Sequence, residues 1–414
     1  MGGVDGLLEA RRIERAEEAA LAGDGLTFAE AMELASTSEQ TLPLLFAAAL
    51  RLRERGKAGV VSYSPKVFIP LTQLCSDFCG YCTFRRDPSD AAPYMSPEDV
   101  LRVAKEGERL GCREALFTLG QRPEQKYPEA KEWLSRRGYR STVDYLAAMC
   151  ALVLRETELL PHSNPGVMTD KELEQLRPVN ASLGMMLESV SGELLEPGGP
   201  HALAPSKHPR ARLATIARAG QHMVAFTTGI LVGLGDSLAD QIRGLMAIRD
   251  LHRQYGHIQE IIIQNFRAKP HTLMAQAPEP DVLNIMRLAA VARLLFGPEM
   301  NIQVPPNLTS QGYARYLDAG INDWGGISPL TPDYVNPEAP WPHIAELRSE
   351  TAGKGLRLRA RYPIYPEFLA ERGGFIDEGI AERIRCEADQ EGYIPELAEE
   401  DAVCSTSTRR LSGR

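Results

Sequence analysis

The pattern of apolar and polar positions divides the chain into a helical beginning and a longer alternating part. In residues 1–60 apolar side chains recur every three or four positions, for example at Leu42 and Leu45, which is the spacing of amphipathic helices. Thr27 followed by Glu30 predicts a capping box at the start of one helix. We therefore expect residues 1–60 to form a helical N-terminal extension that packs on the main domain.

From residue 66 onward, short apolar runs alternate with longer amphipathic stretches. The runs expected as strands cover residues 67–71, 114–119, 158–161, 182–187, 223–234, 258–266, 301–305 and 323–327. Helix-length segments lie between most of them, including 143–155, 210–219, 238–255 and 281–296. Eight strand–helix units predict an α/β fold, a TIM-type (β/α)8 barrel over residues 61–342. A doubly wound open sheet is the alternative, although no early run is followed by a G-x-G-x-x-G fingerprint.

Residues 343–414 are expected to form a C-terminal extension. Residues 343–353 have helical spacing, and a proline-rich passage, R-Y-P-I-Y-P-E-F, follows soon after. From about residue 399 the chain combines acidic residues with serine, threonine and arginine, a composition that predicts a disordered tail.

Composition and charge exclude several classes of protein. The 414 residues are 43% hydrophobic and 24% charged, as in ordinary globular proteins. Lysine and arginine total 46 against 55 acidic residues, a formal charge of −9 without a basic block, which argues against a nucleic-acid partner. No apolar run approaches the roughly 20 residues of a membrane-spanning helix, and the first residues lack a signal-peptide core. We therefore expect a cytoplasmic protein with no membrane partner.

The strongest chemical signal is C-S-D-F-C-G-Y-C, directly after the first predicted strand. It places Cys75, Cys79 and Cys82 in one loop. Three thiolates can hold three irons of a [4Fe–4S] cluster and leave the fourth iron open to another ligand. A structural zinc site is the alternative, but zinc needs a fourth Cys or His ligand. The remaining cysteines are scattered singly and are Cys112, Cys150, Cys386 and Cys404. The first two of these are expected to be packing residues.

The spacing C-x3-C-x2-C, with Tyr81 before the last cysteine, resembles the signature of the radical S-adenosylmethionine (SAM) superfamily. The resemblance implies two cofactors, a [4Fe–4S] cluster and S-adenosyl-L-methionine. In that superfamily the open iron binds the amino and carboxylate groups of SAM, and an electron from the cluster splits SAM into methionine and a deoxyadenosyl radical. The resemblance therefore also implies hydrogen-atom abstraction and a low-potential electron donor as a partner.

The same resemblance implies where SAM is bound. The predicted cofactor contacts are Gly120, Gln121, Glu124, Glu188, Arg212 and Gly229. The first three belong to a turn that resembles the glycine-rich turn meeting the methionine amino group. Glu188 resembles a carboxylate that holds polar groups of the cofactor, and Arg212 an arginine that pairs with its carboxylate. Gly229 is expected to allow a close approach of the nucleoside. The alternative for the polar residues is a surface or helix-capping role.

Longer sequence blocks narrow the resemblance to one family. They are K-V-F-I-P-L-T-x-L-C-x3-C-x-Y-C-T-F-R-R, G-H-I-Q-E-I-I-I-Q-N-F-R-A-K-P, Q-V-P-P-N-L and D-W-G-G-I-S-P-L-T-P-D-Y-V-N-P-E. Together they resemble the first subunit of the FO synthase family over roughly residues 27–367. A single C-x3-C-x2-C motif predicts one subunit rather than the fused, two-barrel form of that family.

This second resemblance implies a particular reaction. The enzyme would be a radical SAM carbon–nitrogen lyase, a 7,8-didemethyl-8-hydroxy-5-deazariboflavin synthase of deazaflavin coenzyme biosynthesis. It would cyclise and deaminate 5-amino-5-(4-hydroxybenzyl)-6-(D-ribitylimino)-5,6-dihydrouracil to 7,8-didemethyl-8-hydroxy-5-deazariboflavin (FO). The implied partner is the second FO synthase subunit, 5-amino-6-(D-ribitylamino)uracil–L-tyrosine 4-hydroxyphenyl transferase, which would supply that substrate.

Residues near the later predicted strands suit such a substrate. Amides can bind uracil edges and ribityl hydroxyls, carboxylates can bind ring N–H groups, and an indole can stack on a flat ring. The predicted substrate contacts are Gln264, Asn265, Lys269, Gln303, Asn307, Asp323 and Trp324. The alternative is that Trp324 belongs to the core and that the amides cap helices.

Two other functions stay open on the sequence alone. One is a different small-molecule radical SAM enzyme of the biotin synthase or hydrogenase maturase type. The other, from a different class, is an iron–sulfur scaffold or electron-transfer protein without radical chemistry. No catalytic residue beyond the cluster ligands is predicted.

Overall fold

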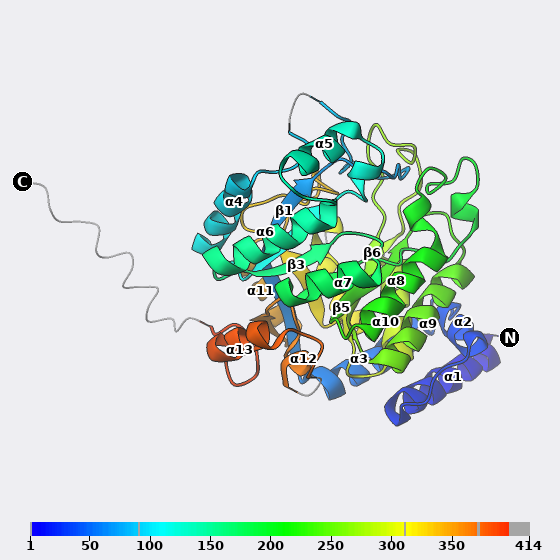
Figure 1. Cartoon of the computed structure of the whole chain (residues 1–414). Helices are drawn as coiled ribbons and strands as arrows, with labels where there is room; N and C mark the ends of the chain where they lie inside the picture. The colour runs from blue at the N-terminus through cyan, green and yellow to red at the C-terminus, as the bar shows by residue number, and fades with distance from the viewer. Residues whose placement is uncertain (1, 90–91, 310–311, 371–372, 397–414) are drawn as a thin grey trace, which may run out of the picture.

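The computed structural model describes residues 2–89, 92–309, 312–370 and 373–396 (Figure 1). Its parallel strands follow the order β2-β3-β4-β5-β6-β7-β8-β1-β9, and β1 also pairs with β2. That additional pairing closes strands β1 to β8 into a barrel, while β9 adds to the beginning of β1. The predicted (β/α)8 barrel is confirmed, and the open sheet is excluded.

The eight predicted runs each overlap one barrel strand. The strands are β1 (Val60–Thr72), β2 (Glu114–Leu119), β3 (Leu160–Asn164), β4 (Ser182–Gly184), β5 (Phe226–Val232), β6 (Ile258–Asn265), β7 (Asn301–Gln303) and β8 (Asp323–Ile327). β1 begins well before its predicted start. The apolar pattern missed its first half because one face of that half is polar. Ser62 and Ser64 there donate hydrogen bonds to the buried carboxylates of Asp323 and Glu114.

Helices cover the outside of the barrel. They are α4 (Pro97–Arg109), α6 (Thr142–Glu156), α7 (Asp170–Leu176), α8 (Pro209–Gln221), α9 (Leu238–Tyr255), α10 (Val282–Phe296) and α11 (Ile344–Gly353), with α5 (Pro128–Arg136) in the β2–α6 connection. Their apolar faces, for example Leu245 of α9 and Ile285 of α10, belong to one large core shared with the strands. Between β7 and β8 the connection contains a 3-10 helix, Tyr313–Ala319, where the other crossovers have α-helices.

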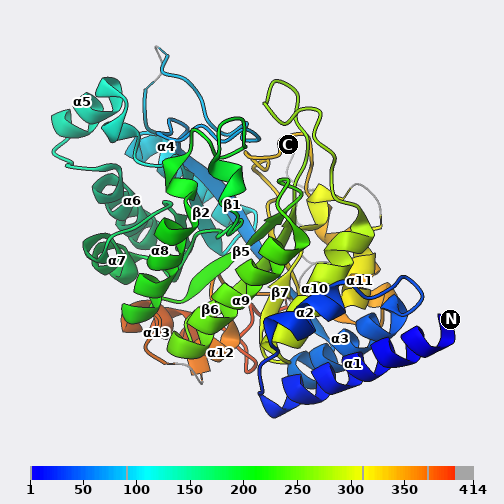
Figure 2. The same cartoon turned by 90° about the vertical axis from the view of Figure 1, so that its right-hand side faces the viewer.

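Three helices precede the barrel, namely α1 (Gly2–Ala22), α2 (Phe28–Ala35) and α3 (Leu42–Lys57). The predicted capping box starts α2: the Thr27 N–H donates to Glu30 Oε2 at 2.8 Å, and the Glu30 N–H donates to Thr27 Oγ1 at 3.3 Å. The three helices lie beside α9 and α10 (Figure 2). Arg249 of α9 donates to the carbonyl oxygen of Leu26 at 2.7 Å, which ties this layer to the barrel.

The C-terminal segment closes the end of the barrel at which the strands begin. It consists of β9 (Arg357–Ala360), α12 (Pro366–Ala370) and α13 (Glu378–Glu387), which lie at the opposite end from α5 (Figure 1). Tyr362, Ile364 and Phe368 form a second apolar cluster with Leu160 at the start of β3. The disordered tail predicted from about residue 399 lies outside the described residues.

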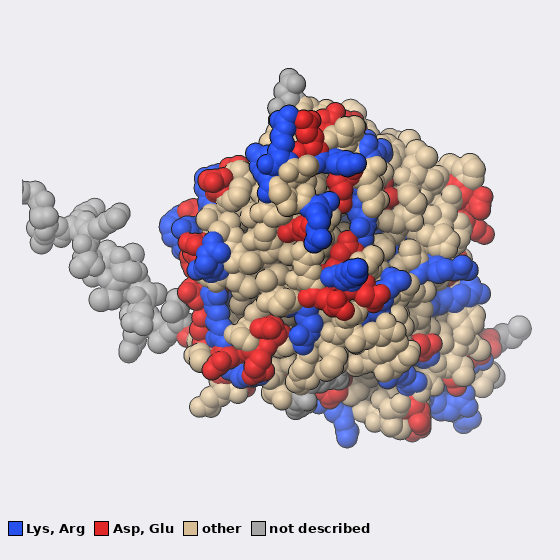
Figure 3. Space-filling model, in the orientation of Figure 1, with Lys and Arg blue, Asp and Glu red and all other residues tan. Residues whose placement is uncertain are grey.

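The surface shown in Figure 3 carries acidic and basic side chains interspersed with each other, without a large area of one sign. Within the part of the chain that the structure describes, every helix is too short or too polar to cross a bilayer.

Candidate active site

A cavity of about 280 Å³ opens at the end of the barrel where the strands finish, as expected for an enzyme of this fold. Its walls come from the loop after β1, from the ends of β2, β4, β5 and β6, and from the loop after β8. The predicted site residues that line it are Cys75, Cys79, Cys82, Gly120, Gln121, Glu188, Arg212, Gln264, Asn265 and Lys269. The cavity therefore brings together the predicted cluster ligands, most of the predicted SAM contacts and part of the predicted substrate set.

The cysteine loop, residues 75–82, is held from two sides by backbone hydrogen bonds. The Gln121 N–H donates to Cys75 Sγ at 3.2 Å, which joins the loop to the turn after β2. The Phe78 N–H donates to the carbonyl oxygen of Leu203 at 2.8 Å, which joins the loop to the segment before α8. These contacts fix the loop across the mouth of the barrel.

Gly120 allows the turn after β2 to pass directly behind the cysteine loop. A Cβ atom at this position would lie 1.9 Å from the carbonyl oxygen of Leu74 and 2.7 Å from Cβ of Cys75. The Gly120 N–H donates to the carbonyl oxygen of Thr72 at 3.1 Å. Because backbone cannot move aside as a flexible side chain can, only glycine fits here. The contact of this turn with SAM stays a prediction.

The three cysteines are free thiols that face one cavity. Burial raises the pKa of Cys75 and raises the pKa of Cys79 to about 12, so these thiolates form only beside a compensating cation. Among the described residues, no group of three His, Cys, Asp or Glu side chains lies close enough together to hold a single metal ion. Cys112 and Cys150 are fully buried in the core, as predicted. The donor set, three soft sulfur ligands on one loop, fits an iron–sulfur cluster better than a four-ligand zinc site.

Glu188 is the centre of a group of buried charges just beyond β4. It forms ion pairs with Lys207 and, at 3.4 Å, with Arg212 Nη1, while His201 Nε2 lies 3.3 Å away. The hydroxyl of Tyr81, in the cysteine loop, donates to the same carboxylate. Burial opposes ionisation of Glu188, but the two cations and His201 outweigh it and hold the pKa of Glu188 well below its usual value. Two cations against one carboxylate leave positive charge for an anionic group of a ligand.

The backbone of Glu188 is strained. Its φ of 68° is in the left-handed region, which non-glycine residues rarely adopt outside functional sites. The Glu188 N–H donates to the carbonyl oxygen of Gly229 at 3.0 Å, and the Glu188 carbonyl oxygen accepts from the Leu231 N–H at 2.9 Å. These two bonds to β5 hold the strained turn and thereby fix the carboxylate over the cavity.

Two buried oxygen atoms in the cavity lining have no hydrogen-bond partner, Thr118 Oγ1 at the end of β2 and Asn265 Oδ1 at the end of β6. The Asn265 amide nitrogen donates to the carbonyl oxygen of Leu308 at 2.9 Å, which sets the orientation of the amide. Asn265 therefore presents only an acceptor to the cavity. Because a buried acceptor without a partner is costly, this pair of oxygens indicates a ligand that brings N–H or O–H groups.

Lys269 lies between the cavity and the cysteine loop. It is 3% exposed, and its ammonium group donates to the carbonyl oxygen of Tyr81 at 3.2 Å. Burial lowers the pKa of Lys269. Lys269 thus joins the segment after β6 to the cysteine loop, and its contact with the substrate stays a prediction.

Other predicted residues do not line the cavity. They are Glu124, Gly229, Gln303, Asn307, Asp323 and Trp324. Asn307 donates to Asp333 Oδ2 at 3.1 Å and so holds the loop after β8, while Glu124 accepts a hydrogen bond from Thr142. A Cβ atom at Gly229 would lie 2.0 Å from the carbonyl oxygen of Ile262. Gly229 is therefore required by its close contact with strand β6, and its contact with the nucleoside stays a prediction.

Gln303 does not line the cavity and instead lies beside a neighbouring strand. It is the last residue of β7, and its side-chain nitrogen would lie 2.0 Å from a Cβ atom at Gly325. Gly325 has a φ of 73°, so a glycine there allows both the left-handed turn and the neighbouring amide. Gln303 therefore packs against β8 inside the barrel.

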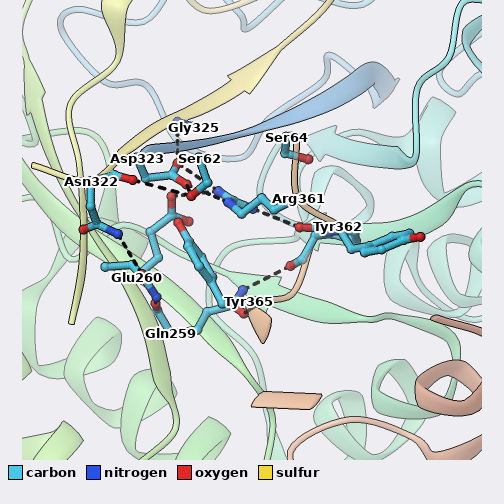
Figure 4. A network of polar contacts seen from close by, with 12 residues as sticks. Ser62, Ser64, Gln259, Glu260, Asn322, Asp323, Gly325, Arg361, Tyr362 and Tyr365 are labelled. Carbon is cyan, nitrogen blue, oxygen red and sulfur yellow. Dashed lines mark hydrogen bonds and ion pairs between the residues drawn. The ribbon is translucent and has the colours of Figure 1, made fainter. Parts of the chain in front are cut away.

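The structure contradicts the substrate contacts predicted for Asp323 and Trp324. Asp323 is the first residue of β8, so it lies at the closed end of the barrel, where it is fully buried. Figure 4 shows it beside Arg361. Its Oδ2 accepts from Arg361 Nε at 2.7 Å, and Arg361 Nη2 also donates to Glu260 Oε1 at 3.1 Å. Trp324 is a core residue, as the alternative held, and its indole N–H donates to Thr351 Oγ1 at 3.1 Å.

Sequence reasoning missed several residues of the cavity and of the charge group around Glu188. Lys207, which lines the cavity, and His201, which contacts Glu188, come from the segment between β4 and α8, which has only short 3-10 turns and neither periodicity nor a motif. Thr118 lies in the predicted strand 114–119, two positions before Gly120, and the apolar pattern of a strand does not mark a site residue. Asn336 lines the cavity from the loop after β8. The signal that could have found Asn336 is the block S-P-L-T-P-D-Y-V-N-P-E, which contains it.

Comparison with known sequences matches this chain to one family. The family described as "Radical SAM superfamily" matches residues 69–244. The chain is 49% identical over 335 residues to the 7,8-didemethyl-8-hydroxy-5-deazariboflavin synthase of Methanopyrus kandleri, which covers 81% of this chain and 99% of that protein. It is 45% identical over 391 residues to the FO synthase of Streptomyces avermitilis, which covers 92% of this chain but only 45% of that longer protein.

Solved structures share the fold. The hydrogenase maturase HydG matches 90% of this chain with a TM-score of 0.72 at 16% identity, covering 81% of that chain. Methylornithine synthase matches 83% of this chain with a TM-score of 0.65 at 19% identity, covering 97% of that chain. At these identities the likeness supports the barrel architecture and no particular substrate.

Proposed function

The chain belongs to the 7,8-didemethyl-8-hydroxy-5-deazariboflavin synthase family of the radical SAM superfamily, and from that premise we propose how its cavity works. The enzyme is a radical SAM lyase that forms FO in deazaflavin coenzyme biosynthesis. We propose that its substrate is the hydroxybenzyl–ribityl–uracil adduct, which it cyclises with release of ammonia. The observation that carries this proposal is the shared cavity of the three cysteines, the Glu188 charge group and the polar strand ends.

The cysteine side of the cavity would bind the two cofactors. Cys75, Cys79 and Cys82 would hold three irons of a [4Fe–4S] cluster. When bound, the cluster and SAM supply a deoxyadenosyl radical that abstracts a hydrogen atom. Arg212, together with Lys207, provides the positive charge to pair with the carboxylate of SAM, because Glu188 neutralises only one of these two cations. The turn at Gly120 and Gln121 closes this part of the cavity.

The strand ends on the other side would bind the adduct. Asn265 Oδ1 and Thr118 Oγ1 are buried and unpaired, and a uracil ring with a ribityl chain carries N–H and O–H groups that can satisfy them. Gln264 of β6 and Asn336 of the loop after β8 line the same space and offer further amides. These residues would orient the adduct toward the cysteine side, where the radical is formed.

We propose that a separate enzyme, the second FO synthase subunit, supplies the adduct. The Streptomyces FO synthase is more than twice as long as the stretch that this chain matches. The reaction would take place in the cytoplasm and would need a low-potential electron donor. A separate partner accords with the full-length match to the Methanopyrus protein.

The test is anaerobic reconstitution with iron and sulfide, followed by incubation with SAM, dithionite and the adduct. We expect deoxyadenosine, ammonia and fluorescent FO to appear together. SAM cleavage without FO from the adduct would indicate another small-molecule radical enzyme of the biotin synthase or maturase type. A cluster whose spectra do not respond to SAM would indicate an iron–sulfur scaffold or electron-transfer protein.

A further inference from the structure

An exposed apolar patch lies on the outer side of the cysteine loop. It consists of Phe78, Leu203 and Leu273, which are 36%, 64% and 73% exposed, and we call it the cysteine-loop patch. Phe78 and Leu203 are joined by an antiparallel bridge. Leu273 lies beside Gly80 of the same loop, because a Cβ atom at Gly80 would be 3.5 Å from Cβ of Leu273. Three segments distant in sequence thus present large apolar side chains on one surface, a feature typical of a protein-binding site.

The cysteine-loop patch faces away from the cavity. Asp77 and Cys79 line the cavity, whereas Phe78 between them does not. Phe78 and Leu203 instead line a separate shallow groove with Lys126, Ala202 and Pro205. A protein bound to this groove would touch the cysteine loop from outside and would leave the cavity free for small molecules.

Positive charge flanks the patch. The Arg85 guanidinium lies 5.0 Å from the centre of the Phe78 ring, although its charge is paired with that of exposed Asp87. The Lys126 ammonium group lines the groove and donates to the carbonyl oxygen of Ser76 at 3.0 Å. Among the described residues that line the groove none is acidic, although the whole chain has a formal charge of −9. An acidic protein would therefore be repelled by the chain as a whole and attracted to this surface, which favours one orientation of encounter.

We propose that the cysteine-loop patch is the docking surface of a small acidic ferredoxin that reduces the enzyme. This inference rests on the proposed function, which needs an electron that the chain itself does not supply. One electron passes from the reduced ferredoxin to the cluster, so the ferredoxin is oxidised and the cluster is reduced; no bond changes and no proton moves. A ferredoxin is a one-electron carrier of low potential, as this step requires.

The position of the cysteine-loop patch favours a ferredoxin over other proteins as its occupant. The enzyme that supplies the adduct must deliver it through the cavity, which the patch does not line. An electron donor needs only to approach the cluster ligands, and Phe78 is the neighbour of Cys79 in the chain. A donor on the patch can therefore act while SAM and the adduct occupy the cavity.

The experiment compares Leu203→Glu with Leu7→Glu in the reconstituted enzyme. Leu7 is a matched control, since it is 67% exposed and lies on α1, outside the patch. Binding of an acidic [4Fe–4S] ferredoxin is measured by calorimetry at low and high salt. We expect Leu203→Glu to weaken binding about tenfold or more, because it adds a like charge and removes apolar contact. Leu7→Glu should bind as the wild type does, and binding of the wild type should weaken as salt rises.

A second readout separates docking from loop damage. SAM cleavage is followed with dithionite and, in parallel, with reduced ferredoxin. Leu203→Glu should lose rate with ferredoxin and keep it with dithionite, and Leu273→Glu should behave in the same way from a different segment. Equal losses with both reductants, or unchanged ferredoxin binding in both variants, would overturn the proposal. The proposal would also be overturned if Leu203→Glu or Leu273→Glu changed the oligomeric state of the enzyme, because a second copy of the chain would then cover the patch. Failure of the proposed function would instead appear in the wild type with dithionite, either as SAM cleavage without FO from the adduct or as no SAM cleavage at all.

Discussion

The two ends of the barrel both bury charged groups, but they use them differently. At the mouth, Glu188 meets Lys207 and Arg212 beside a cavity whose lining includes unpaired oxygens. At the closed end, Asp323 and Glu260 share Arg361, which comes from the segment after β9 (Figure 4). The mouth leaves positive charge and hydrogen-bond acceptors for ligands, whereas the closed end directs its charges at one another.

This difference shows that a buried ion pair is not by itself a sign of a binding site. A second pair near the closed end, between Lys66 and Glu114 at 2.8 Å, has the same burial as the charges at the mouth. What distinguishes the mouth is the cavity and the strained backbone of Glu188. Four substitutions, taken from the largest expected effect to the smallest, test whether the two ends are as separate as their geometry indicates.

The largest effect is expected for Cys79→Ala at the mouth. It removes one of three thiolates, and among the described residues no fourth cysteine lines the cavity to replace it. Cluster content and SAM cleavage should both be lost, while the unfolding midpoint of the apoprotein changes little. Iron analysis and deoxyadenosine formation measure this. Cys386→Ala, on the exposed face of α13, is the control and should behave as wild type. Normal iron content in Cys79→Ala would contradict the assignment.

The next effect belongs to the closed end. Arg361→Met leaves Asp323 and Glu260 buried without their cation, and breaking such a pair from one side costs about 3–5 kcal/mol of folding free energy. Urea unfolding measures the loss. Arg385→Met, which breaks an exposed pair with Glu378, should cause no measurable change. SAM affinity of folded Arg361→Met should stay at the wild-type value; a tenfold weaker affinity would show that the two ends are coupled.

Arg212→Met is the counterpart at the mouth. It removes one cation from the Glu188 group, and a lost charge-assisted hydrogen bond to SAM is worth about 1.5–3 kcal/mol. That corresponds to roughly ten- to a hundredfold weaker binding. Titration of the reduced cluster with SAM measures the affinity, with iron content as the check that the cluster is assembled. Unchanged affinity together with a large loss of stability would give Arg212 a purely structural role.

The smallest effect is expected for Trp324→Phe. The substitution keeps most of the buried aromatic volume and removes the indole N–H that donates to Thr351, a net loss of about 1 kcal/mol. FO formation should keep its KM for the adduct. A clear rise in that KM without loss of stability would indicate that Trp324 contacts the substrate. It would contradict the separation of the two ends.

The sequence predicted the barrel because its strands are apolar runs separated by amphipathic helices, and both patterns arise from local burial. It also predicted the cysteine loop, whose residues are close in the chain. The prediction for Asp323 was wrong because a polar residue at the edge of a short run can stand at either end of a strand, and Asp323 is the first residue of β8 rather than the last.

Long-range contacts account for the residues that sequence could not place. Arg361 stands in a proline-rich passage that has the composition of a loop, and its partner Glu260 lies 101 positions earlier. His201 and Lys207 reach Glu188 from the segment between β4 and α8, which contains only short 3-10 helices. Only the folded chain brings these cations to their carboxylates, so neither spacing nor periodicity could assign them.

The dependence of β1 on late partners has a consequence for synthesis on the ribosome. The beginning of β1 pairs with β8 and β9, and the contact between Ser62 and Asp323 spans 261 positions. The first barrel strand therefore leaves the ribosome long before the strands that cover it, with its edge open to other chains. Arg361 is made later still, after both carboxylates that it neutralises. The start of β1 can accordingly be covered only after β8 and β9 have been synthesised. It is the part of the growing chain that most needs protection from aggregation.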